Sequence, residues 1–225
     1  MTTQTATPND TQTLEQSLNK TDMGHFIFEH RKSFIAALLI VFIGAVGFMI
    51  YKQTKQSAQL KMASELFSFE QNVVKNFNEG KITSDELMKQ FNQLSKELKA
   101  NSYLVPITLA SAKKLNEKGQ SAQALELVKE MTTYHKSGIG MIYLSHQLAT
   151  LAEDQGQLDQ ALSTLNNLAK SGEKVLLSKT FLDLGRLEMK KGNKDQALKY
   201  FSSLIKDFPN DELAKVAKIY MTEIQ

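Results

Sequence analysis

The side chains of this sequence that are best suited to metal binding are its histidines, His25, His30, His135 and His146. Glu29 lies beside the first pair, but residues five apart point to different sides of a helix and do not converge on one ion. The other two histidines are isolated in the sequence. Cysteine is absent, which excludes disulfides, cysteine-ligated metals and a cysteine nucleophile. The sequence therefore predicts no metal site and no cofactor.

Paired carboxylates are the other pattern that supports catalysis, as a general acid and a general base. Here the pairs are sequence neighbours, Glu153 with Asp154 and Asp211 with Glu212. Neighbouring side chains on a helix diverge by about 100°, so we interpret these as surface charges near helix ends. No HExxH, serine elbow, phosphate loop or dinucleotide fingerprint occurs. We expect a protein that is not an enzyme.

A seven-residue phrase recurs in the second half of the chain, as GQSAQAL at 119–125, GQLDQAL at 156–162 and GNKDQAL at 192–198. The matching glycines lie 37 and then 36 residues apart. Such periods are typical of helix-turn-helix units, which stack because one unit cannot bury its own apolar face. The sequence therefore predicts an all-α solenoid that offers a binding surface.

The last unit shows the expected pattern within one repeat. Helix A is predicted over about 174–190, and helix B runs from 194 until Pro209 ends it. Gly192 between them is expected to be left-handed, where a Cβ atom would cost about 1 kcal/mol or more. The apolar stripe of helix B is formed by Ala197, Leu198, Phe201, Leu204 and Ile205.

Ala124, Ala161 and Ala197 occupy the same position in the three units, where helix B is expected to cross helix A. A methyl group allows the two helix axes to approach within about 8–10 Å, whereas a larger side chain would separate them. We predict that these alanines are packing residues.

An apolar run, FIAALLIVFIGAVGFMIY at 34–51, has 18 residues without a charge. At helical rise it covers roughly 27 Å, close to the thickness of a hydrocarbon core. The run is longer than the core of a cleaved signal peptide and no cleavage site follows it, which favours an uncleaved anchor. Basic residues flank it on both sides, so charge alone does not set its orientation. Because a long domain follows a single span, we expect the repeats to lie outside the cytoplasmic membrane.

These assignments divide the chain into four segments. Residues 1–22 are a polar tail, too poor in apolar groups to offset ordering entropy, and 23–51 hold the juxtamembrane segment and the transmembrane helix. Residues 52–100 form a tether helix and a divergent helix pair, and 101–225 form the repeats with a C-terminal capping helix at 211–224. The net charge of +3 is spread along helices, so nucleic acid is not an expected partner.

The repeats resemble the tetratricopeptide family. The last unit carries that family's marks at the family's spacing, in Phe181, Leu184, Gly185, Ala197, Phe201 and Pro209. The resemblance implies that helix A lines a protein-binding inner surface, formed by Leu109, Lys113, Tyr143, His146, Lys179, Leu182, Arg186 and Met189. Such mixed groups suit an extended polypeptide, although several of them would serve equally as packing between helices. Asp183 replaces an expected basic residue, which argues against binding of C-terminal carboxylates.

The whole layout from about residue 24 resembles the YfgM family, the ancillary subunit of the bacterial SecYEG translocon. The resemblance rests on FEHRKSF at 28–34 entering a single span, on the tether helix, and on LNNLAKSGEK at 165–174 leading into the last unit. It implies an inner-membrane protein with a cytoplasmic N-terminus and a periplasmic repeat domain. The implied partners are the SecYEG translocon, a membrane-anchored prolyl-isomerase-like chaperone and unfolded secreted polypeptides.

Two other functions fit the same pattern of span and repeats. One is a structural scaffold in another envelope assembly, such as a pilus, division or outer-membrane assembly machine, where the surface grips one folded partner. The other is a regulatory adaptor whose repeats face the cytoplasm. Both keep the protein-interaction surface and differ in what it holds.

Overall fold

The computed structural model describes residues 30–224, and within this range every element is helical. The predicted all-α fold with one N-terminal apolar helix and tetratricopeptide-like repeats is confirmed for these residues. The predicted tail at 1–22, together with His25 and Glu29, lies outside the described residues.

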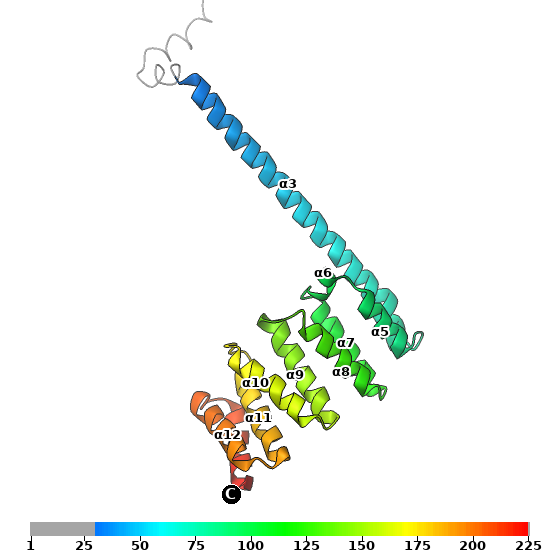
Figure 1. Cartoon of the computed structure of the whole chain (residues 1–225), viewed down its shortest axis with the longest axis vertical. Helices are drawn as coiled ribbons and strands as arrows, with labels where there is room; N and C mark the ends of the chain where they lie inside the picture. Colours follow the sequence, from blue (N-terminus) through cyan, green and yellow to red (C-terminus); the bar gives the residue numbers. More distant parts are fainter. Residues whose placement is uncertain (1–29, 225) are drawn as a thin grey trace, which may run out of the picture. The chain divides into compact units, whose positions relative to one another are not determined.

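The element labels follow Figure 1. The elements are α3 (Arg31–Phe69), a wide turn of π-helix η1 (Glu70–Val74), α4 (Lys75–Asn78), α5 (Ser84–Gln93), α6 (Lys96–Lys99), α7 (Leu104–Glu117), α8 (Ser121–Thr132), α9 (Gly138–Asp154), α10 (Leu158–Lys170), α11 (Leu177–Lys191), α12 (Lys194–Asp207) and α13 (Glu212–Ile224).

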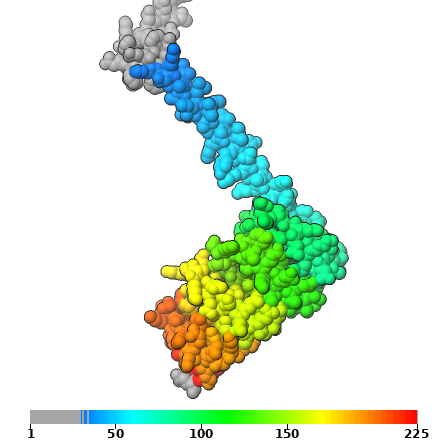
Figure 2. All heavy atoms as spheres, viewed as in Figure 1, coloured from blue at the N-terminus to red at the C-terminus, as the bar shows by residue number. Residues whose placement is uncertain are grey.

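Helices α7 to α12 form three hairpins, α7 with α8, α9 with α10 and α11 with α12, and each helix also contacts the next along the chain. The first helix of one unit contacts the first helix of the next in the case of α7 and α9, and α13 covers α11 and α12. Figure 1 shows these hairpins as successive layers, and Figure 2 shows their atoms packed together in sequence order. This arrangement is the stacked solenoid that the repeat period predicts.

Each hairpin turns at the repeated glycine. Gly192 ends α11 with φ of 87°, in the left-handed region predicted for it, and Gly119 and Gly156 have φ of 76° and 73°. In the last unit the next amide, that of Asn193, donates to the Glu188 carbonyl at 2.8 Å, which closes the helix end. The glycine thus fixes the angle at which helix B returns against helix A.

Helices A and B cross where one of them carries almost no side chain. Gly185 is buried on α11, and a Cβ atom there would overlap the ring of Phe201 on α12. One repeat earlier the equivalent pair is Ala149 with Leu165, so a larger residue on helix A goes with a smaller one on helix B. The two side chains at the crossing therefore differ in size in opposite directions between the last two units.

The predicted packing alanines Ala124, Ala161 and Ala197 have no exposed surface, which confirms their role. They belong to two buried apolar clusters, one from Leu66 to Leu187 and a smaller one around Phe201 under the capping helix. Phe201 in the second cluster stacks on Tyr220 of α13, with ring centroids 5.5 Å apart. The capping helix therefore closes the apolar stripe of the last unit.

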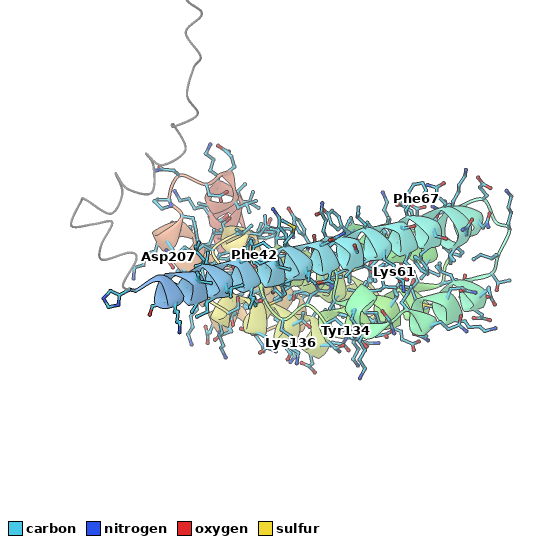
Figure 3. All side chains as sticks on the ribbon, turned by 90° about the horizontal axis from the view of Figure 1, so that it is seen from above. Phe42, Lys61, Phe67, Tyr134, Lys136 and Asp207 are labelled. Atoms are coloured by element: carbon cyan, nitrogen blue, oxygen red, sulfur yellow. The ribbon has the colours of Figure 1, made fainter. Side chains whose placement is uncertain are left out.

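Helix α3 is apolar on all sides along its first half. Its large apolar side chains from Ile35 to Tyr51 are exposed, and Figure 3 shows Phe42, 65% exposed, on this helix. By length and composition, the continuous helical stretch Ile35–Asn78 includes a segment able to cross a membrane. A helix that is apolar all round and unburied matches lipid better than water.

Contacts divide the chain into two units, Met1–Lys61 and Met62–Gln225. The second unit contains the end of α3 together with all the later helices. The segment boundaries predicted at residues 22, 51 and 100 stay predictions.

The tight crossing at Gly185 can be tested by a double-mutant cycle with Phe201. Gly185→Ala should destabilise the repeats, because overpacking costs about 1–3 kcal/mol and outweighs a helix-propensity gain of at most about 1 kcal/mol. Adding Phe201→Leu, which copies the pair of the middle repeat, should recover part of that loss, with a coupling of about 1 kcal/mol. Urea unfolding of the full chain in detergent, followed by helical circular dichroism, measures each variant. Additive effects of the two changes would contradict the proposed crossing.

Candidate protein-binding surface

The eight residues predicted to contact polypeptide all lie on the first helices of the three units. Leu109 and Lys113 lie on α7, and Tyr143 and His146 on α9; the remaining four, Lys179, Leu182, Arg186 and Met189, lie on α11. Only Lys113 and Tyr143 among the eight are exposed, with 78% of the Lys113 side chain accessible. The other six are half-buried or buried.

His146 is buried in a polar contact between α9 and α11. Its Nε2 lies 3.2 Å from the Thr180 hydroxyl, and its Nδ1 lies 3.5 Å from the Asp183 carboxylate. Lys179 donates to the same carboxylate at 2.5 Å. Burial raises the pKa of Asp183, but the hydrogen bonds from His146 and Lys179 outweigh it and leave that pKa below its usual value. Asp183 therefore stays ionised and holds both neighbours in place.

A second polar contact joins the same two helices nearer their C-terminal ends. Both terminal nitrogens of Arg186 donate to Glu153, at 2.5 and 2.6 Å, and Lys190 donates to Glu153 at 3.2 Å. The hydrogen bond from Arg186 lowers the pKa of Glu153 and raises that of the guanidinium. Only 13% of the Glu153 side chain is exposed. The interpretation of Glu153 as an ordinary surface charge is therefore wrong, since it is an inter-repeat anchor.

The structure thus gives most of the predicted contact residues a packing contact. His146, Lys179 and Arg186 belong to the polar seam between α9 and α11. Leu182 and Met189 pack against the cluster around Phe201. Their binding of polypeptide stays a prediction, and the packing alternative describes their observed contacts. Glu153, Thr180 and Asp183, which complete the seam, were not predicted as functional residues.

A row of exposed apolar residues marks the beginnings of the same helices. Tyr103, Ile139 and Val175 follow one another at intervals of 36 residues and are 74%, 53% and 48% exposed. Each lies at or just before the first turn of α7, α9 or α11. Ile139 and Val175 occupy equivalent positions, because the second and third repeated glycines are also 36 residues apart. Tyr103 lies one position after the equivalent residue of the first unit, because the first two glycines are 37 residues apart. We call these three exposed side chains the apolar edge. Tyr143, 47% exposed, lies one turn further along α9. The 36-residue recurrence is visible in the sequence, but these positions fall outside the family's known marks.

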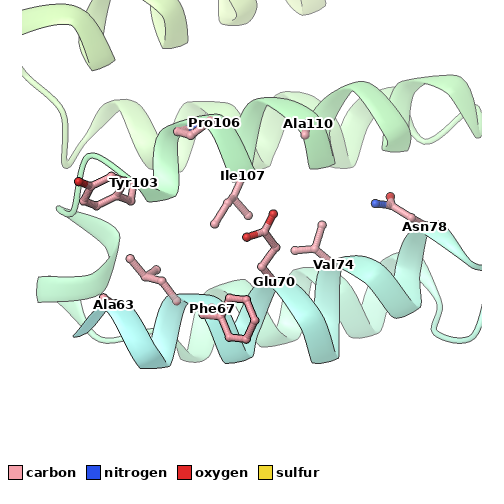
Figure 4. Close-up of a pocket in the computed structure, with 10 residues that line it drawn as sticks. Ala63, Phe67, Glu70, Val74, Asn78, Tyr103, Pro106, Ile107 and Ala110 are labelled. Atoms are coloured by element: carbon pink, nitrogen blue, oxygen red, sulfur yellow. The ribbon is translucent and has the colours of Figure 1, made fainter. Parts of the chain in front are cut away.

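The edge begins at an open groove between the helical stretch 63–78 and α7. The groove has a volume of about 560 Å³, and Figure 4 shows its two walls. Phe67 on one wall is 64% exposed. The lining residues are Ala63, Leu66, Phe67, Glu70, Val74, Asn78, Tyr103, Pro106, Ile107 and Ala110. None of the eight predicted contact residues lines this groove, which sequence reasoning therefore missed.

The seam predicts an acid-sensitive contribution to stability. Glu153→Gln should lower the free energy of unfolding by about 1–3 kcal/mol at pH 7, because it weakens a charged, partly buried contact. A lowered folded-state pKa stabilises the fold above the ordinary value of 4.5, and this contribution is lost as the pH falls through the folded value. The gap between wild type and variant should therefore narrow as the pH falls below 4.5.

Urea unfolding of the full chain at a series of pH values measures this gap. Glu126→Gln on α8 is the matched control, because Glu126 is exposed and belongs to none of the ion pairs of residues 30–224. A gap of the same size at pH 7 and pH 3.5 would contradict the role assigned to Glu153.

Known proteins share this architecture. The family described as a tetratricopeptide repeat-like domain matches residues 25–178, and a tetratricopeptide repeat matches 179–211. The curated ancillary SecYEG translocon subunit of Haemophilus influenzae is 29% identical over 173 residues, which cover 77% of this chain and 80% of that protein.

Solved structures with similar folds include the TPR2AB domain of yeast Sti1 in its pHSP90 complex, with a TM-score of 0.45 and 18% identity. That match covers 55% of this chain and about half, 49%, of the Sti1 chain. MamA matches with a TM-score of 0.43 and 16% identity, over 67% of this chain and 90% of its own. With more than half of its residues matched by one family, the chain belongs to the tetratricopeptide repeat-like domain family, and its resemblance to the YfgM family is confirmed.

Proposed function

We propose that this protein is a single-pass inner-membrane protein that assists secreted polypeptides at the exit of the SecYEG translocon. Its repeats lie in the periplasm, where they hold emerging chains and pass them to periplasmic chaperones. A membrane-anchored prolyl-isomerase-like chaperone is its expected neighbour. The match along most of the chain to a protein named an ancillary SecYEG translocon subunit supports the location of this role.

The exposed apolar edge is the observation that carries the proposal. Tyr103, Ile139 and Val175 remain largely accessible at the beginnings of helices on which most other large apolar side chains are buried or half-buried. We interpret the recurrence of one such side chain in each unit as a surface that a partner covers. Their spacing along several repeats suits an extended chain more than a small ligand, because each repeat offers one apolar contact.

A membrane anchor makes weak contacts of this kind sufficient. A segment held near the translocon exit meets emerging chains at a high effective concentration, so the surface needs little intrinsic affinity. Low affinity in turn allows the chain to leave for the next chaperone. The proposed role is therefore protein binding without catalysis, which the repeat family and the name of the relative also favour.

The orientation predicts the activity of a reporter. A phosphatase that is active only outside the cytoplasm, fused after Gln225, should be active in cells. The same fusion with a reporter that is active only in the cytoplasm is the control and should be inactive. The reverse pattern would place the repeats in the cytoplasm and favour the regulatory adaptor.

Photocrosslinking tests which class of partner the surface binds. A photoreactive residue at Ile139 or Tyr143 should trap many different nascent secreted chains, because both positions are exposed on α9. The same residue at Glu126, exposed on α8, is the matched control and should trap far fewer. Co-purification in mild detergent should recover translocon subunits.

A single stoichiometric partner at Ile139 and Tyr143, without translocon subunits, would instead support the scaffold of another envelope assembly. Such a result would remove the proposed role in secretion while leaving the binding surface in place.

A further inference from the structure

We propose that the groove between residues 63–78 and α7 selects polypeptide segments in which apolar side chains flank a single lysine or arginine. The inference rests on the proposed function and specifies which part of an unfolded secreted chain is held first. The groove is lined mainly by apolar residues, and it adjoins the apolar edge at Tyr103, which belongs to both.

The π-helical turn gives the groove one continuous wall. Ala63, Phe67, Glu70, Val74 and Asn78 all line it, although they span 16 residues. In a regular α-helix those residues would turn about 60° beyond four full revolutions, which would move Asn78 off the face of Ala63. In η1 the amide of Lys75 donates to the carbonyl of Glu70, five residues back, and this wider turn takes up the offset.

Each wall of the groove carries one aromatic side chain. Phe67 and Tyr103 are 64% and 74% exposed, and Ile107 on α7 lies between Tyr103 and Ala110. Rings of this size gain most when a partner covers them, because they bury a large apolar area and lose little side-chain entropy. A volume of about 560 Å³ lies within the range of ligand-binding sites and admits a few side chains.

Charge decides which side chains these are. Glu70 is exposed and lies in the middle of the apolar wall, and no lysine, arginine or histidine is among the groove's lining residues. Figure 4 shows its carboxylate pointing from the wall toward α7, below Ile107. If the bound apolar segment contained an acidic residue, its carboxylate would lie close to that of Glu70, and the two negative charges would repel each other. A lysine or arginine instead lays its aliphatic stem along the apolar wall and brings its charge to Glu70 and the nearby rings.

Another large hollow of the described repeats has a different character. It lies between α8, α9 and α10, has a volume of about 670 Å³ and is lined by Lys129, Lys136 and several hydroxyl and amide groups. Tyr103 and Phe67, the exposed rings, are absent from its lining. The apolar groove is therefore the better match to segments of unfolded chains.

Peptide binding tests the inference directly. The full chain is placed in phosphatidylcholine nanodiscs and titrated against three fluorescein-labelled peptides of alternating leucine, phenylalanine and serine, with a central lysine, glutamine or glutamate. Fluorescence anisotropy should show the highest affinity for the lysine peptide, a lower one for the glutamine peptide and the lowest for the glutamate peptide. The affinities of the lysine and glutamate peptides should differ roughly fivefold at low salt and less at high salt. Empty nanodiscs give the background.

Three variants assign the preference to the groove. Glu70→Lys should reverse the ranking, and Phe67→Ala should weaken all three peptides while keeping their order. Glu126→Lys, the same charge change on exposed α8, should leave the ranking unchanged. Helical circular dichroism confirms that each variant is folded.

Several results would overturn the inference. These are equal binding of the three peptides by wild type, an unchanged ranking in Glu70→Lys, or no binding above that of empty nanodiscs. A dimer that Phe67→Ala converts to a monomer would show that a second copy covers the groove, and would also overturn it. In each case, recovery of translocon subunits and crosslinks from Tyr143 would still support the proposed function. Failure of the groove's peptide preference can therefore be distinguished from failure of the proposed function.

Discussion

The structure depends on one constraint: a helical hairpin with an apolar stripe on both helices cannot bury that stripe alone. Stacking solves this, and the crossing of Gly185 with Phe201 shows how closely the helices must approach for it to do so. Because each unit buries the face of the previous one, the last unit needs a cover. Helix α13 supplies it through Tyr220, and the apolar cluster ends there.

Stacking also gives charged residues on the inner surface a structural role. Between α9 and α11 the contact is largely ionic, with Glu153 and Arg186 toward the C-terminal ends of the helices and His146 and Asp183 near their middles. Partly buried ion pairs contribute geometry as much as energy, since losing one partner leaves the other unsatisfied. These residues fix the register of two repeats, and the groups available to a partner are those that stacking leaves uncovered.

The sequence predicts the fold well because periodicity and glycine chemistry are local. The recurrence at 37 and 36 residues predicts the stacked hairpins. Local sterics predict the left-handed conformation of Gly192 and the burial of the alanines at the crossings, and the structure shows both. The surface is harder to predict. Family positions identify helix faces but not which groups, such as His146 and Asp183, find partners on the next repeat. The groove depends on a π-helical turn at Glu70, which residue types alone do not indicate.

The open groove lies where the repeat pattern begins, and this has a physical reason. Within the array, successive units pack through α8 with α9 and through α10 with α11, and small residues recur at the crossings inside the units. The stretch 63–78 is instead the end of a long helix with its own composition, and its wide turn aligns a wall of large apolar residues opposite α7. A mismatch between a divergent first helix and a regular second one leaves space that neither fills. The least regular part of the array is therefore also the part that leaves an apolar groove open.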